Sequence, residues 1–160
     1  MEWTINTSLA VNYIVKISED VLSPLNDDIA VYSNTGDGAS NRRLVAVDKK
    51  VMELYRERIE TYFQSQKLNA HFVILDGVES KKNTDSLFML LHEMEQFNLD
   101  RRNESVISIG GGVVQDIVGL AATLYRRGVP YIRIPTTLLG IVDVSIAAKT
   151  AVNFENRRNR

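Results

Sequence analysis

The spacing of apolar residues changes repeatedly along the chain, and this predicts strands that alternate with helices. Four short apolar runs are typical of buried strands: 43–47, 71–75, 105–109 and 131–134. Apolar residues recur at helical spacing in 50–66, 84–97 and 113–126, and a last helical stretch is expected between Thr137 and Thr150. Because such alternation produces a parallel sheet with helices on both faces, the predicted fold class is α/β and Rossmann-like.

The pattern is weaker in the first part of the chain. Residues 3–17 alternate well enough for one or two edge strands, and the polar stretch 33–41 is a loop by composition. Farther along, Gly128 is placed to end the helix before it, and Pro130 prevents its continuation.

Composition narrows the classes of function. The 160 residues suit one domain, which we assign to 1–152, with the polar and basic 153–160 as the start of a connector. The net charge of -1 argues against a dedicated nucleic-acid binder. The sequence has no cysteine, which excludes a disulfide framework and a thiolate metal site and is compatible with a reducing cytoplasm. Residues 1–10 lack the pattern of a signal peptide or membrane span, so a cytoplasmic protein is expected.

Three consecutive glycines, Gly110 to Gly112, stand between a predicted strand and an almost wholly apolar helix. Glycines at such a turn let a phosphate approach backbone amides, and the helix N-terminus adds positive partial charge. However, the Rossmann fingerprint would need glycine at Gln115, and the Gly-Lys-Ser/Thr ending of a P-loop is absent. Two interpretations stay open from the residues alone: a phosphate site with Asp116 beside it, or a tight turn without a ligand.

Distinctive blocks surround this turn. They are the glycine block 110–116, the Leu-Tyr-Arg-Arg-Gly-Val-Pro block 124–130, and the blocks 135–139, 142–143 and 148–153. Upstream, Asp48 ends a predicted strand and Glu-Ser-Lys-Lys at 79–82 precedes a helix. In order and spacing these blocks resemble the 3-dehydroquinate synthase superfamily of sugar-phosphate cyclases, over residues 43–160.

The resemblance implies an N-terminal α/β domain that binds NAD, followed by a helical domain that holds a divalent metal, zinc or cobalt. Family members convert a ketose phosphate into a carbocycle by transient oxidation, elimination of phosphate and an aldol closure. No net oxidation occurs, so the implied enzyme is a lyase. The resemblance also implies a homodimer, and no nucleic-acid or membrane partner is expected.

The same resemblance implies roles for individual residues. The expected NAD contacts are Asp48, Glu79, Lys82, Gly111, Gly112, Val113, Asp116, Thr136 and Thr137. The expected catalytic residues are Asp143 and Lys149. The expected substrate ligands are Asn159 and Arg127, the latter for a phosphate in the neighbouring subunit of a dimer.

Most of these residues also have structural interpretations. Asp48 is a common kind of helix N-cap, and the threonines at 136–137 can cap the last helix. Glu79 and Lys82 can form a solvated turn, and Arg127 can be an ordinary cation at a helix C-terminus.

One lysine and the two histidines have surroundings that bear on their roles. Lys149 lies in the apolar stretch 146–152, where a lysine needs a counter-charge or a water-filled cleft, and a phosphorylated substrate would supply the counter-charge. His71 and His92 have no second ligand at metal spacing, so we interpret both as structural or surface residues and assign no metal ligand in this chain.

Several residues depart from typical 3-dehydroquinate synthases: Lys50, Gln115, Arg158 and the pair Ala147-Ala148 in place of Gly-Gly. The Tyr-Arg-Arg-Gly and Val-Asn-Phe motifs are more similar to the 2-epi-5-epi-valiolone synthase branch, whose substrate is sedoheptulose 7-phosphate. Small side-chain differences in a binding pocket change the relative preference for two substrates by modest free energies. We therefore expect a valiolone-type substrate ahead of the substrate of 3-dehydroquinate synthase.

Three functions compete at this point. The first is the N-terminal part of a cyclase, which would hold NAD but be inactive alone. The second is a stand-alone nucleotide-binding module that shares only the fold. The third, a net dehydrogenase, is weaker because the Rossmann fingerprint fails at Gln115.

Overall fold

The computed structural model describes residues 1–7, 12–34, 40–147, 149–155 and 157–159. Its centre is a parallel sheet with the strand order β2-β1-β3-β4. The strands are β1 Arg42–Asp48, β2 Asn69–Leu75, β3 Val106–Gly110 and β4 Tyr131–Pro135. This arrangement confirms the predicted α/β class and all four predicted strands.

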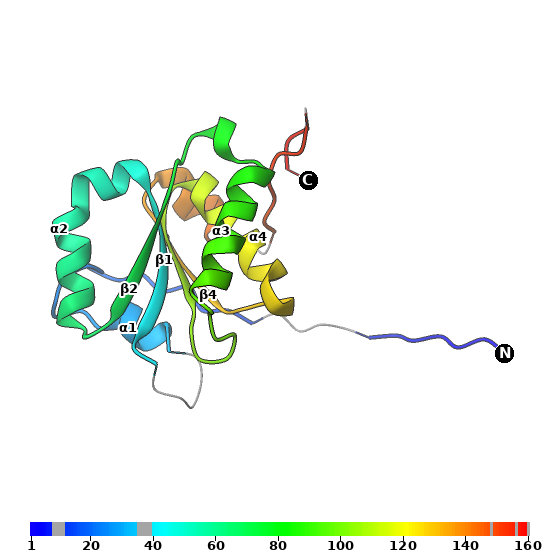
Figure 1. Cartoon of the computed structure of the whole chain (residues 1–160), viewed down its shortest axis with the longest axis horizontal. Coiled ribbons are helices and arrows are strands. Elements are labelled where there is room, and N and C mark those ends of the chain that lie inside the picture. Colours follow the sequence, from blue (N-terminus) through cyan, green and yellow to red (C-terminus); the bar gives the residue numbers. More distant parts are fainter. Residues whose placement is uncertain (8–11, 35–39, 148, 156, 160) are drawn as a thin grey trace.

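Helices cover both faces of the sheet. They are α1 Asp28–Tyr32, α2 Lys49–Ser65, α3 Thr84–Gln96 and α4 Gly112–Leu124. Figure 1 shows α1 and α2 on one side of the strands and α3 and α4 on the other. Each side has its own buried apolar cluster, one around Ile59 and Tyr62, the other around Leu90 and Ile117. The predicted two-sided covering is therefore confirmed.

The central strands are mostly apolar on both faces because both faces are covered, with Arg43 and Ser108 as buried polar exceptions. In β1 the five residues between Arg42 and Asp48 are buried, and all of β3 is buried. The edge strand β2 instead alternates between exposed and buried positions near its end. Continuous apolar runs are the expected signature of inner parallel strands.

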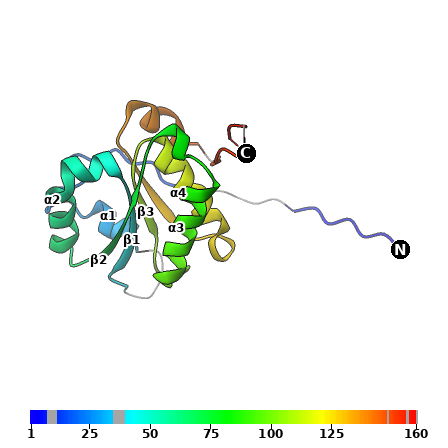
Figure 2. The same cartoon turned by 45° about the horizontal axis from the view of Figure 1, so that its top comes forward.

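Three short helical turns join these elements: η1 Glu79–Lys81, η2 Tyr125–Arg127 and η3 Gly140–Val144. η1 and η3 lie beyond the carboxyl ends of the strands, at the top of Figure 1, and Figure 2 brings this edge forward. Gly128 follows η2 with a φ of 106° and donates its N–H to Tyr125 O, which confirms its predicted role as a helix stop.

Two predictions about secondary structure were wrong. Residues 3–7 and 12–17 contain no strand, because no described strand pairs with them; residues 8–11 lie outside the described part. An isolated strand has no partner for its backbone groups, so alternation alone does not produce one. The last helix ends at Val144 rather than Thr150, because the carbonyls of Val144 and Ala147 bond to Arg133.

Two other predictions fall partly outside the described residues. The predicted loop at 33–41 includes 35–39, and the Ala147-Ala148 pair includes Ala148. None of the described helices is long and apolar enough to cross a membrane.

Candidate functional site

The carboxyl edge of the sheet gathers most of the residues to which the sequence assigned a function. Asp48 ends β1, Gly110 ends β3, and Thr136 follows β4. The register pairs Gly110 with Pro135, so these two strands end level with each other. Ligands of open α/β sheets bind at this edge, and the turns after β3 and β4 form the candidate site.

The start of α4 has no capping side chain. Gly111 is its N-cap residue and supplies no side-chain bond, and the first turn contains no acidic residue. The other long helices are capped: Asp48 accepts from Lys50 N in α2, and Asn83 accepts from Ser86 N in α3. The first amides of α4 thus have the arrangement that suits an external anion, supported by the positive end of a 13-residue helix.

Two glycines permit close packing beneath this turn. A Cβ on Gly110 would lie 2.8 Å from Val114 Cβ and 3.1 Å from Asp48 Cβ. A Cβ on Gly77 would overlap Asp48 Oδ2. The site therefore requires bare backbone at both positions, and Gly77 leaves the space in which the Asp48 carboxylate lies.

Lys82 and Asp116 form an ion pair of 2.5 Å between Nζ and Oδ2, with side-chain exposures of only 8% and 14%. Lys82 Nζ also donates to Asn159 Oδ1 at 2.7 Å. The interpretation of Lys82 as part of a solvated turn was therefore wrong. Asp116 lies beyond the first turn of α4, so its partner is this lysine rather than the helix dipole.

Residues near the C-terminus hydrogen-bond to the same group of residues around Lys82. Asn153 donates its backbone N–H to Lys82 O and its amide Nδ2 to Glu79 Oε1 at 3.0 Å. Asn153 Oδ1 in turn accepts from Asn159 N. Glu79, Lys82 and Asn159, which the sequence assigned to ligands, are thus brought together with Asp116.

The turn after β4 carries the other predicted residues on its surface. Thr137 Oγ1 accepts from Gly140 N at 3.1 Å, so the structural interpretation as a cap is confirmed for Thr137. Thr136, Asp143 and Lys149 are exposed. The exposure of Lys149 agrees with the second of the two surroundings expected for it, contact with water, and a counter-charge from a phosphorylated substrate stays a prediction.

Arg127 lies apart from this group, at the opposite edge of the sheet. It belongs to η2, just before β4 begins, and its side chain is exposed. Beside it, burial raises the pKa of the Tyr125 phenol, which hydrogen-bonds Glu95.

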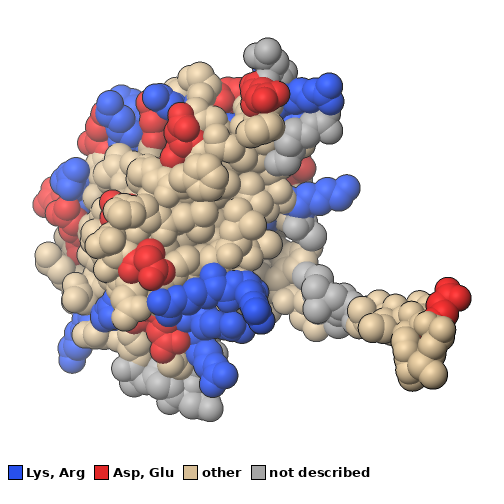
Figure 3. Space-filling model, turned by 45° about the vertical axis from the view of Figure 1, so that its right-hand side comes forward, with Lys and Arg blue, Asp and Glu red and all other residues tan. Residues whose placement is uncertain are grey.

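Figure 3 shows lysines and arginines gathered on the lower part of the surface, below a mainly uncharged expanse.

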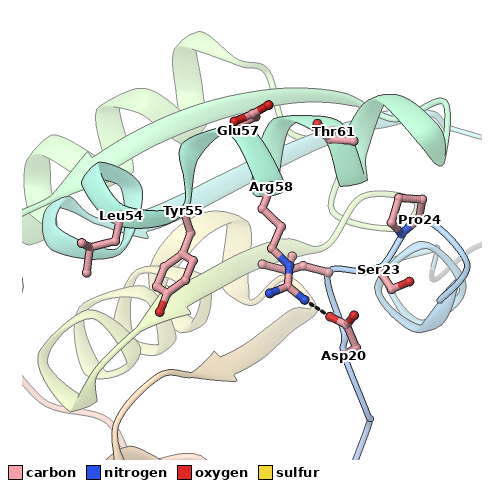
Figure 4. Close-up of a pocket in the computed structure, with 9 residues that line it drawn as sticks. Asp20, Ser23, Pro24, Leu54, Tyr55, Glu57, Arg58 and Thr61 are labelled. Carbon is pink, nitrogen blue, oxygen red and sulfur yellow. Dashed lines mark hydrogen bonds and ion pairs between the residues drawn. The ribbon is translucent and has the colours of Figure 1, made fainter.

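A surface hollow of about 510 Å³ lies elsewhere, along α2. Figure 4 shows Arg58 reaching from α2 to its ion-pair partner Asp20, with Tyr55 and Leu54 beside them. Arg58, the basic residue that lines this hollow, is already paired with Asp20, and none of the predicted site residues lines it. We therefore keep the carboxyl edge as the candidate site.

The described residues contain no group of three or more histidine, aspartate or glutamate side chains that could hold a metal ion. His71 Nε2 lies 3.0 Å from Glu93 Oε2, and both His71 and His92 are exposed. The interpretation of the two histidines as surface residues is confirmed.

Sequence reasoning missed the structural role of Gln115. This residue is fully buried, accepts from Ser108 Oγ at 2.6 Å and donates to Gly110 O at 3.2 Å. It thereby fastens the first turn of α4 to the end of β3. A signal was available, because a glutamine in an otherwise apolar helix must find partners when it is buried.

Comparison with known proteins agrees with this geometry. The model of the family described as 3-dehydroquinate synthase N-terminal matches residues 72–160, more than half of the chain. The chain belongs to the 3-dehydroquinate synthase N-terminal family. The resemblance inferred from the sequence blocks is thereby confirmed.

Relatives within this superfamily cover nearly the whole chain. It is 40% identical over 158 residues to a 2-epi-5-epi-valiolone synthase from Streptomyces hygroscopicus subsp. jinggangensis, covering 99% of this chain and 38% of that protein. A solved structure of the enzyme of that name from the same organism, with NAD+ and Zn2+ bound, matches with a TM-score of 0.89, 39% identity and coverage of 99% and 42%.

More distant relatives carry related names. A 3-dehydroquinate synthase from Prochlorococcus marinus is 32% identical, covering 92% of this chain and 40% of that protein. A 2-deoxy-scyllo-inosose synthase complexed with carbaglucose-6-phosphate, NAD+ and Co2+ matches with a TM-score of 0.66 and 25% identity, covering 74% and 32% of the two chains. This chain therefore spans about two fifths of the length of the curated relatives it matches.

Proposed function

We propose that this chain is the NAD-binding, N-terminal part of a sugar-phosphate cyclase, with residues 1–152 as that domain and 153–160 leading to a helical metal-binding domain. The observation that carries the proposal is the uncapped N-terminus of α4 behind Gly111, at the carboxyl edge of a parallel sheet. Family membership and a solved relative with NAD+ bound support it. The whole reaction would require residues that this chain does not include.

The residues of the edge fit a dinucleotide. The bare amides of Gly112 and Val113 at a helix N-terminus suit a diphosphate. Asp48 uses Oδ1 to cap α2, which leaves Oδ2 as an acceptor for ribose hydroxyls. Glu79, Lys82 and Asp116 would line the nicotinamide side, with their positions fixed by mutual bonds and by Asn153.

Bound NAD would supply transient oxidation of a ring hydroxyl, which acidifies the neighbouring C–H so that phosphate can leave. The contribution of this chain is to bind and orient. The hydroxyls of Thr136 and Thr137 would lie near the cofactor. Asp143 would orient substrate hydroxyls, and Lys149 and Asn159 would bind substrate oxygens. Lys149 and Asp143 are exposed, so their partners would come from the substrate and the second domain.

Sedoheptulose 7-phosphate is the proposed substrate, with 2-epi-5-epi-valiolone as product. The alternative is 3-dehydroquinate synthase activity. The chain is 40% identical to the valiolone synthase and 32% identical to the 3-dehydroquinate synthase, which favours sedoheptulose 7-phosphate as the substrate. We also propose a cytoplasmic homodimer in which Arg127, exposed at the far edge, reaches the phosphate in the neighbouring subunit.

NAD binding tests the site directly. Calorimetric titration of this chain with NAD should yield binding that Gly112→Val abolishes, because valine there obstructs the diphosphate and crowds Val144, whose Cγ2 is 3.2 Å from a Cβ at this position. Thr61→Val, on the exposed face of α2, is the matched control and should leave the affinity unchanged. Unchanged affinity in a folded Gly112→Val variant would refute the assignment of the glycine turn.

A fusion tests the reaction. These 160 residues joined to the remaining part of the Streptomyces relative, with NAD and Zn2+, should release phosphate from sedoheptulose 7-phosphate without accumulating NADH. The unfused chain should release none. Accumulation of NADH would favour the dehydrogenase hypothesis, and turnover by the unfused chain without metal would overturn the assignment as a partial enzyme. A fusion that binds NAD but never releases phosphate would favour the stand-alone binding module.

A further inference from the structure

Arg133 is a half-buried charged residue in the middle of the edge strand β4. Tyr131 and Arg133 share one face of the strand, and Tyr131 packs against the apolar cluster formed with α3 and α4. The Arg133 guanidinium lies 5.0 Å from the centre of the Tyr131 ring, and its Nη2 donates to Tyr131 Oη at 2.5 Å. The guanidinium is therefore fixed in direction by its own strand.

The other end of the guanidinium binds the chain beyond η3. Arg133 Nη1 donates to Val144 O at 2.6 Å, to Ala147 O at 2.6 Å and, more weakly, to Ser145 O at 3.4 Å. The last carbonyls of a helix have no intrahelical partner and carry negative partial charge, so a cation there stabilises them. One side chain thus ends η3 and holds the turn that follows it.

The residues held in this way lie between the two predicted catalytic residues. Asp143 directly precedes Val144, and Lys149 follows Ala147 by two positions. The backbone N–H groups of Ile146 and Ala147 both donate to Asp143 O, which ties Asp143 into the same turn. Tyr13 Oη donates to Ile146 O, and the Thr150 methyl lies over Gly119 of α4.

The hydrogen bonds that Arg133 makes within the described residues all go to the chain itself. Nη1 serves the carbonyls and Nη2 serves Tyr131. Nε is buried and has no hydrogen-bond partner among the described residues. These bonds give Arg133 an effect on the chemistry through the segment that it holds.

We propose that Arg133 is a positioning residue that fixes residues 143–147 and thereby aims Asp143, and with it Lys149 two positions farther along the chain, at the substrate. The proposal rests on the proposed function, because that function gives Asp143 and Lys149 their roles. A displacement of catalytic groups by about 1 Å can cost on the order of 10²-fold in rate. Loss of the guanidinium is expected to lower kcat on that scale while NAD, bound at the neighbouring turn, keeps its affinity.

The first test needs no activity. Hydrogen exchange is measured in the 160-residue chain for wild type, Arg133→Met and Arg133→Lys, with Arg56→Met as the matched control on the exposed face of α2. Arg133→Met should speed exchange at Ser145, Ile146 and Ala147 about tenfold or more, with β3 and α4 unchanged, because only local opening is affected. Arg133→Lys should restore part of the protection. Equal exchange in wild type and Arg133→Met would overturn the proposal.

The second test uses the active fusion. Arg133→Met should lower kcat about 10²-fold with the NAD dissociation constant changed less than about twofold, and Arg133→Lys should recover part of kcat. A variant with loosened residues 145–147 but normal kcat would reject the positioning role. If the wild-type fusion itself releases no phosphate, the proposed function fails, and the exchange result then reports only on the contact.

Discussion

The two neighbouring turns at the carboxyl edge are built by different forces. The turn between β3 and α4 is held mainly by burial: Val114, Ile117 and Val118 of α4 are fully covered, and even the bonds of Gln115 lie in the core. The turn after β4 leaves Leu138 and Leu139 exposed at 76% and 65%, and polar groups hold it instead. The nucleotide half of the proposed site is therefore preformed by the core, whereas the substrate half depends on a few directional bonds.

The largest expected difference between the two turns is in the free energy of unfolding lost when an apolar side chain is truncated. Ile117→Ala removes a fully buried side chain from α4 and should lower the free energy of unfolding by about 2–5 kcal/mol, through lost transfer energy and a cavity. Ile141→Ala, in η3, removes a side chain that is 52% exposed and should change it by less than about 0.5 kcal/mol. Urea denaturation measures both. Similar losses for the two variants would contradict the contrast between the turns.

Lysines provide a second comparison. Lys82→Met leaves Asp116, only 14% exposed, without its cation, and should lower the free energy of unfolding by about 3 kcal/mol. Lys149→Met removes an exposed charge and should cost less than about 0.5 kcal/mol.

Both lysine variants are compared by urea denaturation at pH 7. The double variant Lys82→Met with Asp116→Leu serves as the control, because an apolar replacement of both partners is often neutral. A double variant as unstable as Lys82→Met alone would mean that the lost stability does not come from an unpaired Asp116.

The same contrast explains what the sequence could predict. The helix expected at 84–97 is observed at Thr84–Gln96, because its period is local and its buried face is continuous. The helix expected to reach Thr150 ends at Val144, because the side chain that ends it comes from the preceding strand. Local periodicity carries no information about such a partner.

The candidate site divides in a similar way. The position of Asp48 and the glycine turn at one edge follows from the rule that parallel strands end together. The pairing of Lys82 with Asp116 and the tie from Asn153 to Glu79 depend on tertiary packing, so no spacing in the sequence predicts them. The role of Asp143 came from family resemblance alone, and that of Lys149 from resemblance and its apolar neighbours in the sequence; the structure leaves both exposed.

The smallest expected effect separates the two threonines of the second turn. Thr137→Val keeps the shape of the side chain but removes the acceptor for Gly140 N, and should lower the free energy of unfolding by about 1 kcal/mol, as for other helix caps. Thr136→Val is the matched control at an exposed position and should change it by no more than about 0.5 kcal/mol. Amide exchange at Gly140 should rise only in Thr137→Val, because this N–H donates to the Thr137 hydroxyl. If Gly140 exchange were the same in both variants, the bond would not hold this turn, and Arg133 would be left as its main polar support.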